Sequence, residues 1–183
     1  RTRSDLARDA LRRQLALWRF ERVRRRVLPL AESQGLLDRR RRLSRRVVKV
    51  FFDTNVLIAA FATRGLCADL FAHVLLEHEL VVGEVVLTEL RAKLRTKLKL
   101  PKKTIDEIEG QLRDGIVVKA PAKHLGLGIS DPDDEWVVAS AVAGGADVLV
   151  TGDAAVLKLG KRAPLPILSP RGLWELLRNP RPG

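Results

Sequence analysis

The chain has 183 residues, of which 46% are hydrophobic and 31% charged, which suits one domain of ordinary size plus an appendage. Its longest apolar runs fall far short of the about 20 residues that a membrane span needs, so no membrane partner is expected. The lone Cys67 excludes an internal disulfide framework and a multi-cysteine zinc site. A reducing, cytoplasmic location is therefore the default expectation.

The positive charge is concentrated at the N-terminal end. Residues 1–46 hold 16 of the 34 Lys and Arg residues and 5 of the 22 Asp and Glu residues, a net charge of +11. Residues 47–183 therefore carry only +1 of the total of +12. This asymmetry indicates a basic arm attached to a nearly neutral domain.

The arm is predicted to be largely helical. Residues 4–28 have Ser4 as a favourable N-cap and apolar residues at helical spacing. Residues 29–46 read as a tail or linker that carries Arg39–Arg42, followed by Arg45 and Arg46. Residues 1–46 are accordingly predicted to form a basic helical arm that precedes the compact domain.

From Val47 onward, short apolar segments alternate with stretches of helical periodicity. Strands are expected at Val47–Phe52, Leu80–Val82, Ile116–Val118, Val148–Val150 and Pro166–Leu168. Helices are expected at Asn55–Phe61, Cys67–His78, Glu84–Leu98, Thr104–Leu112, Asp133–Gly144 and Arg171–Leu177. The alternation predicts an α/β domain over residues 47–178 with a parallel sheet covered on both faces, followed by a disordered tail at 179–183.

Acidic residues follow several of these strands, where an open parallel sheet gathers its ligands. Asp53 directly follows the first strand, and Asp153 lies three residues after the strand that ends at Val150. Glu89 lies on the helix after the second strand, and Asp134 opens the Asp133–Gly144 helix. We expect the side chains of these residues to converge at one edge of the sheet.

Each acidic residue also has a structural interpretation. Asp134 and Asp153 could cap or complement a helix N-terminus, and Glu89 could be a solvated helix position. Asp53 is harder to explain in this way, because a carboxylate that ends a buried strand has few structural uses. Clustered carboxylates repel one another and need a counter-ion, and oxygen ligands of this kind suit Mg²⁺ or Mn²⁺ better than zinc.

Four segments together resemble the acidic motifs of PIN-domain nucleases. Val50–Ile58 resembles their opening strand, Leu87–Leu90 their second motif, Asp131–Ala139 their third and Val150–Asp153 their fourth. The order and spacing agree over roughly residues 47–170, and the sequence resembles the PIN-family toxins of bacterial toxin–antitoxin pairs, of the VapC type. This resemblance implies a three-layer α/β/α sandwich, divalent-metal-dependent endoribonuclease activity and dimerisation.

The resemblance also assigns roles to individual residues. Asp53, Glu89, Asp134 and Asp153 would be the catalytic, metal-binding set for Mg²⁺ or Mn²⁺. The polar residues Asn55 and Thr151 would support the carboxylates or water. Within the third motif we prefer Asp134 as the ligand, with Asp131 as the alternative. The implied partners are an RNA substrate, a second copy of the chain and a cognate antitoxin.

The start of the arm is similar to the second helix of ribbon–helix–helix antitoxins, and the rest of the arm resembles their C-terminal extension. Because the DNA-reading strand of that family is missing here, DNA binding is expected only through a complete antitoxin.

Three interpretations of the arm remain: a solvated helix packed on the domain or on a second copy, a nucleic-acid-binding arm, or an antitoxin-like arm over the acidic cleft. We favour the third, since guanidinium groups pair well with carboxylates. Its apolar anchors would be Trp18, Phe20, Leu28 and Leu30.

The leading functional hypothesis is a metal-dependent endoribonuclease that acts as a toxin and carries an antitoxin-like arm. One alternative is a non-catalytic assembly or nucleic-acid-binding module whose acidic cluster docks arginines. Another is a PIN nuclease of RNA processing. Cys67 and the histidines His73, His78 and His124 lack ligand or nucleophile spacing, so packing or surface roles are expected for them.

Overall fold

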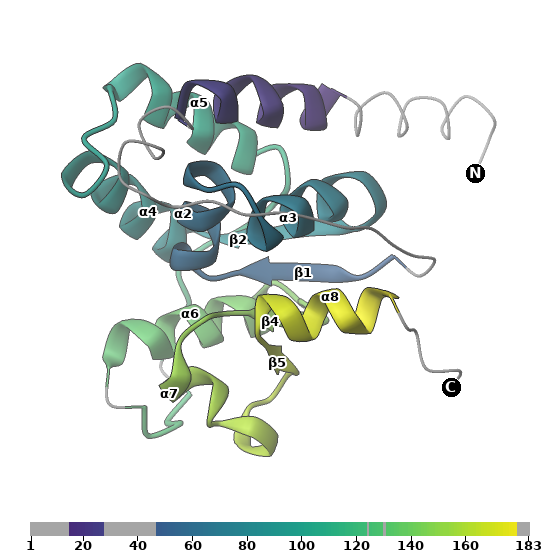
Figure 1. Cartoon of the computed structure of the whole chain (residues 1–183). Coiled ribbons are helices and arrows are strands. Elements are labelled where there is room, and N and C mark those ends of the chain that lie inside the picture. The colour runs from purple at the N-terminus through teal and green to yellow at the C-terminus, as the bar shows by residue number, and fades with distance from the viewer. Residues whose placement is uncertain (1–14, 28–46, 124, 130, 179–183) are drawn as a thin grey trace, which may run out of the picture.

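The computed structural model describes residues 15–27, 47–123, 125–129 and 131–178 (Figure 1). Its strands are β1 (Lys49–Phe52), β2 (Glu79–Gly83), β3 (Ile116–Val118), β4 (Val148–Val150) and β5 (Ile167–Leu168). Its helices are α2 (Thr54–Ala62), α3 (Leu66–Glu77), α4 (Glu84–Thr96), α5 (Lys102–Leu112), α6 (Pro132–Ala143), α7 (Ala154–Leu157), the 3₁₀ helix η1 (Gly160–Arg162) and α8 (Pro170–Arg178). The predicted strands and helices of the domain are all present, with shifts of a few residues at their ends. The short elements α7 and η1 were not predicted, because they are too short to show a helical period.

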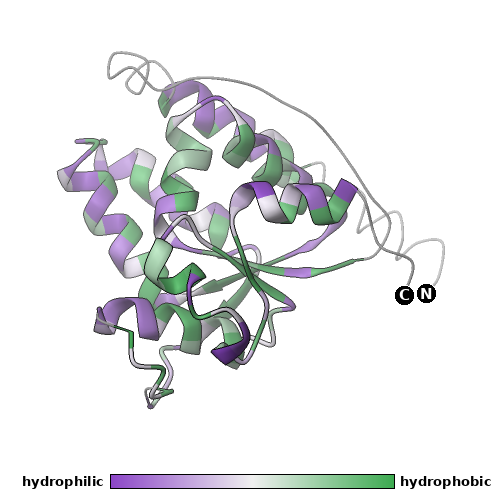
Figure 2. Cartoon of the chain, turned by 60° about the horizontal axis from the view of Figure 1, so that its bottom comes forward, coloured by the Kyte–Doolittle hydropathy of each residue, from purple (hydrophilic) through white to green (hydrophobic). Residues whose placement is uncertain are grey.

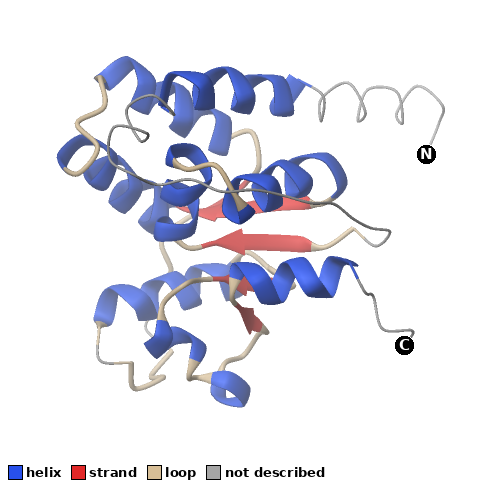
Figure 3. Cartoon of the chain, in the orientation of Figure 1, coloured by secondary structure: helices blue, strands red, loops and turns tan. Residues whose placement is uncertain are grey.

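The five strands form one parallel sheet in the order β3-β2-β1-β4-β5. Helices flank this sheet (Figure 3), and the predicted α/β/α architecture is confirmed. The strand order reverses beside β1, because the chain builds outward through β2 and β3 and then returns to pair β4 with the other side of β1. Ligands of open α/β sheets bind beyond the carboxyl ends of the strands at such a point.

The central strand is buried on both faces. Val50, Phe51 and Phe52 of β1 have no exposed surface, and the strands are mostly green in the hydropathy view of Figure 2. A strand that is covered by helices on both sides must be apolar at successive positions, which explains the unbroken Val-Phe-Phe run. No helix in the described segments is long and apolar enough to cross a membrane.

Small residues bring α6 close to the sheet. A Cβ atom on Gly83 would lie 2.9 Å from the Cβ atom of Ser140, and one on Gly144 would lie 2.6 Å from Cγ2 of Val118. Backbone approaches of this kind leave no room for a methyl group. They fix α6 against β2 and β3 and thereby set the position of its N-terminal turn, which carries Asp134.

The helix at residues 15–27 packs on the domain through one apolar face. Phe20, Val23 and Val27 are at most 2% exposed. The Phe20 ring centroid lies 5.2 Å from that of Phe61 in α2 and 5.0 Å from that of Phe71 in α3. The helix is therefore part of the same hydrophobic core as the sheet.

Polar contacts flank this apolar face. Arg26 donates through Nη1 to both carboxylate oxygens of Glu107 in α5, at 2.8 and 2.7 Å. The side-chain amide of Gln111 donates to the carbonyl oxygen of Ala16 at 3.0 Å, and Arg19 pairs with Asp114. These contacts place the helix along α5.

The anchor predictions for the arm have mixed outcomes. Phe20 is an anchor, as predicted, but the prediction for Trp18 is wrong, because its side chain is 59% exposed and packs under the guanidinium of Arg22. Two residues along a helix are about 200° apart, so Trp18 and Phe20 cannot share one face. The predicted anchors Leu28 and Leu30 lie outside the described residues, as do the predicted helix start before residue 15 and the tail at 179–183.

Candidate active site

The acidic residues singled out from the sequence lie at the carboxyl edge of the sheet, on both sides of the reversal in strand order. Asp53 follows the central strand β1, and Asp153 follows its neighbour β4. Glu89 lies on α4 after β2, and Asp134 lies in the first turn of α6. Separate segments of the chain therefore contribute one carboxylate each.

Asp53 is the most buried of these carboxylates, with 7% of its surface exposed. Its backbone N–H donates to the carbonyl oxygen of Val150 at 2.9 Å, and its Oδ2 accepts a hydrogen bond from Oγ1 of Thr151 at 2.8 Å. Burial raises the pKa of Asp53, the Thr151 hydrogen bond opposes this increase, and the charge of Glu89 adds to it. A buried carboxylate beside a second acid is costly to ionise unless a cation is near.

Thr151 connects Asp53 to Asp153. Its hydroxyl donates to Asp53 and accepts from the backbone N–H of Asp153 at 2.9 Å. Oδ1 of Asp153 in turn accepts from the backbone N–H groups of Ala155 at 2.7 Å and Val156 at 3.1 Å, so Asp153 caps α7. The structural interpretation of Asp153 thus holds, and it is compatible with membership of the cluster.

The pKa of Asp134 is shifted by burial and by the charges of neighbouring acidic residues. Its pKa is raised to about 6, first by burial and then by the negative charges of Asp153, Asp131, Asp53 and Glu89. Interactions between charges weaken with distance and are screened by salt, so the carboxylates whose charges act on Asp134 lie near it. The four carboxylates predicted to form a set therefore lie in one electrostatic cluster.

Asp131 and Asp134 differ in their local roles. Oδ1 of Asp131 accepts from the backbone N–H of Asp133 at 2.9 Å, and Pro132 occupies the first turn, so Asp131 is the N-cap of α6. Asp134 lies one residue beyond Asp133 and responds to the charges of the other acidic residues. This division of roles favours Asp134 over Asp131 as the ligand of the third motif.

Glu89 has partners on two helices. The hydroxyl of Thr54, in the first turn of α2, donates to its Oε2, and the ammonium group of Lys93 lies 2.5 Å from its Oε1. Lys93 Nζ also donates to Oδ1 of Asn55 at 3.0 Å. Asn55 was expected to orient carboxylates or water; the contact found for it is with Lys93.

Thr54 and Lys93 are contributors that sequence reasoning missed. The spacing of Glu89 and Lys93, four residues apart on a helix, could have indicated their pairing. The contacts of Thr54 with Glu89 and of Lys93 with Asn55 join α2 to α4, and no local pattern reveals them.

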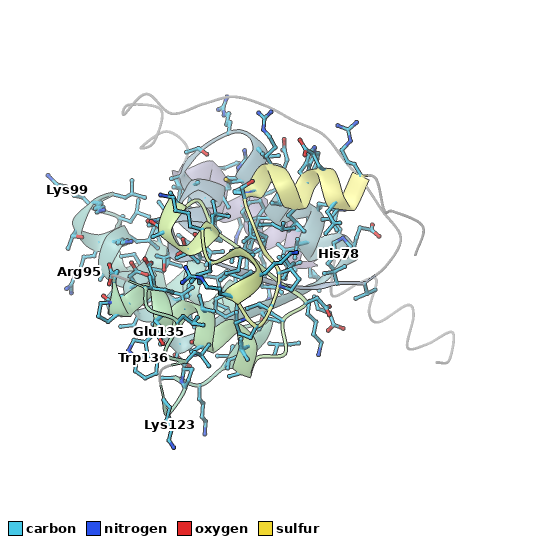
Figure 4. All side chains as sticks on the ribbon, turned by 90° about the horizontal axis from the view of Figure 1, so that it is seen from below. His78, Arg95, Lys99, Lys123, Glu135 and Trp136 are labelled. Atoms are coloured by element: carbon cyan, nitrogen blue, oxygen red, sulfur yellow. The ribbon has the colours of Figure 1, made fainter. Side chains whose placement is uncertain are left out.

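Glu135, the neighbour of Asp134, holds the loop before α6. It is 8% exposed, and its Oε1 accepts from the backbone N–H of Gly126 and, at 3.2 Å, from that of Leu127. In Figure 4, Glu135 and Trp136 mark the start of α6, far from His78 at the other end of the molecule. This carboxylate therefore supports the loop that precedes α6.

The chemistry of the acidic set fits a hard divalent cation. Its members are oxygen donors, and the pKa values of Asp53 and Asp134 are raised, first by burial and further by neighbouring carboxylates. Within the segments that the structure describes, no group of three or more His, Cys, Asp or Glu side chains is arranged so that it could hold a metal ion. The carboxylates are instead engaged with Thr151, Thr54, Lys93 and backbone N–H groups.

The cysteine and the described histidines are packed in the protein interior or partly buried. Burial raises the pKa of Cys67, which disfavours a reactive thiolate. His73 and His78 are buried with their rings 5.1 Å apart, and Nδ1 of His78 accepts from the backbone N–H of Val48. His124 lies outside the described residues.

Comparison with known proteins gives a family match. A family model described as "PIN domain" matches residues 49–155, which is more than half of the chain. Among solved structures, VapBC2 from Rickettsia felis, crystallised with a DNA fragment from its promoter, is 18% identical to the chain with a TM-score of 0.47. That match covers 66% of this chain and 98% of the other. No curated protein sequence matches the chain.

Proposed function

The chain belongs to the PIN-domain family, whose members are generally nucleases, and on that premise we propose that it is a divalent-metal-dependent endoribonuclease. The observation that carries the proposal is geometric: Asp53, Glu89, Asp134 and Asp153 come from separate segments and lie at the carboxyl edge of one parallel sheet. Burial and then the neighbouring negative charges raise the pKa of Asp134 there to about 6. A divalent cation would balance the negative charge that the ammonium group of Lys93 leaves uncompensated, and PIN nucleases use such an ion to hydrolyse phosphodiester bonds.

We assign Asp53, Glu89, Asp134 and Asp153 as the residues that would hold Mg²⁺ or Mn²⁺. When bound, the ion would lower the pKa of water and neutralise negative charge on the scissile phosphate. Thr151 orients the carboxylate of Asp53 and fixes the backbone at Asp153 with the same hydroxyl. Asp131 keeps a supporting role as the cap of α6.

Metal-dependent cleavage of RNA tests this assignment. The full chain is incubated with total RNA in Mg²⁺, in EDTA, and in EDTA followed by excess Mg²⁺, and the new RNA ends are mapped. We expect internal cuts only when Mg²⁺ is free. Asp53→Asn and Asp134→Asn should remove cleavage, whereas Asp133→Asn, in the same turn as Asp134 and exposed, should retain it.

Folded but inactive wild-type protein in every metal would refute the nuclease proposal. It would favour the non-catalytic assembly module, in which the acidic cluster only docks arginines. Cleavage that persists in EDTA would refute the role of the metal. Growth arrest on expression of the active chain, but not of Asp53→Asn, would separate a toxin from a nuclease of RNA processing.

We further propose that residues 1–46 act as an antitoxin-like arm that lowers the nuclease activity of the same chain. Two facts support this. Residues 15–27 are held on the domain by the buried Phe20, and the arm carries a net charge of +11 that complements the acidic cluster. The contacts made by residues 15–27 are with α2, α3 and α5, so any cover over the cluster would come from other residues of the arm.

Charge substitution tests the arm without disturbing its anchor. Replacing Arg39–Arg42, Arg45 and Arg46 by Gln should raise the rate of RNA cleavage while Phe20 keeps the helix in place. Replacing Arg22 and Arg25, two exposed arginines of the docked helix, is the matched control and should leave the rate unchanged. A cleavage rate of the first variant that is equal to or lower than that of the wild type would refute inhibition in cis.

We also propose that the chain forms a dimer, and light scattering of the same samples checks its oligomeric state.

A further inference from the structure

Lys93 places a positive charge inside the acidic cluster. Its ammonium group lies 2.5 Å from Oε1 of Glu89 and donates to Oδ1 of Asn55 at 3.0 Å. Its charge also reaches Asp53, whose pKa it lowers against the effects of burial and of Glu89. We propose that Lys93 is a tethered counter-ion that competes with the divalent cation for Glu89. This inference rests on the proposed metal-dependent function.

The contacts of Lys93 differ from those of an ordinary surface lysine. Lys102 forms the same kind of pair four residues along a helix, with Asp106 at 2.7 Å, but its side chain is 85% exposed. The side chain of Lys93 is only 22% exposed, and it reaches across from α4 to Asn55 on α2. Lys93 is therefore held by tertiary contacts in the cluster, and its charge is less screened by water than that of Lys102.

Glu89 has both oxygens engaged. Oε2 accepts from the Thr54 hydroxyl, and Oε1 pairs with Lys93. A cation that uses Glu89 must displace one of these partners. Thr54 has no exposed surface and is fixed in the first turn of α2, whereas Lys93 has a long side chain with four rotatable bonds. Lys93 is the partner that can leave.

Competition from Lys93 lowers the affinity of the site for a divalent cation below the affinity that the carboxylates alone would give. While no divalent ion is bound, Lys93 offsets part of the repulsion among the carboxylates. When an ion binds, the ammonium group loses its contact with Glu89, and that loss reduces the affinity for the ion. Removing the charge of Lys93 should therefore strengthen ion binding and weaken the ion-free fold.

Titration with Mn²⁺ tests this, using the full chain and electron paramagnetic resonance to count free Mn²⁺. Lys93→Gln should bind Mn²⁺ about fivefold more tightly, equivalent to about 1 kcal/mol, the upper range for a partly exposed ion pair. Lys93→Arg, which keeps the charge, should retain the wild-type affinity. The control Lys97→Gln removes an exposed lysine at the C-cap of α4 and should change nothing.

Thermal unfolding supplies the second readout. Lys93→Gln should unfold at a lower temperature than the wild type in EDTA, and saturating Mn²⁺ should raise its melting temperature by a larger increment. Unchanged or weaker Mn²⁺ binding by Lys93→Gln, with wild-type binding intact, would overturn the competition and leave the proposed function standing. If the wild type itself binds no Mn²⁺, the metal-dependent function fails and this inference fails with it.

Discussion

The electrostatic strain at Asp134 gives a stability prediction that does not depend on catalysis. Its pKa is about 6 in the folded protein, against an ordinary value of 3.8. Between these two values the folded state binds the proton more tightly than the unfolded state. Folding stability therefore falls as the pH rises through this window, and above it the ionised Asp134 destabilises the ion-free protein.

Asp134→Asn should remove this destabilisation. The full difference between 3.8 and about 6 corresponds to about 3 kcal/mol, but Asp134 is substantially open to water, and screening reduces the expected gain to about 1 kcal/mol. In a chain of 183 residues, a gain of that size raises the melting temperature by about 2–4 °C. The gain should be full near pH 8 and much smaller at pH 4.5, where the wild-type carboxyl is largely protonated.

Urea unfolding in EDTA measures the effect. Wild type, Asp134→Asn and the exposed control Asp133→Asn are compared at pH 4.5 and pH 8, and the difference in unfolding free energy is taken at each pH. A loss of stability in Asp134→Asn at pH 8, or a gain that is the same at both pH values, would refute the raised pKa of Asp134. An equal gain in Asp133→Asn would show that the effect is not specific to the cluster.

The packing of Phe20 and the hydrogen bonds of Thr151 give two more predictions. Phe20→Ala should destabilise the full chain by about 3–5 kcal/mol in urea unfolding, because the ring is fully buried; the exposed Trp18→Ala should change stability by less than about 0.5 kcal/mol. Equal effects would refute the docking of the helix. Thr151→Val keeps the shape of the side chain but removes the hydroxyl that serves Asp53 and Asp153. We expect Thr151→Val to cleave RNA more slowly at saturating Mg²⁺. The control Thr88→Val, on the exposed surface of α4, should cleave at the wild-type rate. Equal rates for the two variants would show that Thr151 does not support the site.

The fold was predictable because each local signal agrees with the global arrangement. The apolar run in β1 requires cover on both faces, and alternation of strands and helices leaves the parallel sheet as the natural architecture. The convergence of the acidic residues results from the same rule, since segments that come after parallel strands share one edge. That rule brings Asp53 and Asp153 together although 100 positions separate them.

Tertiary contacts explain what the sequence did not reveal. The pairing of Lys93 with Asn55 depends on how α2 packs against α4, and periodicity carries no such information. Trp18 differs for another reason: its large aromatic side chain favours an anchor role, but the helical phase turns it toward solvent. Phe20, Val23 and Val27 define the buried face, and Trp18 lies opposite to it.

Binding of a divalent cation by Asp53, Glu89, Asp134 and Asp153 is proposed and can be observed directly. The most direct measurement is the anomalous scattering of Mn²⁺ from crystals of the full chain grown with the ion, because it locates the metal independently of activity. We predict an anomalous peak among these four carboxylates, with Lys93 withdrawn from Glu89. Well-ordered carboxylates with no peak between them in saturating Mn²⁺, or a peak elsewhere on the molecule, would show that these residues do not bind the ion.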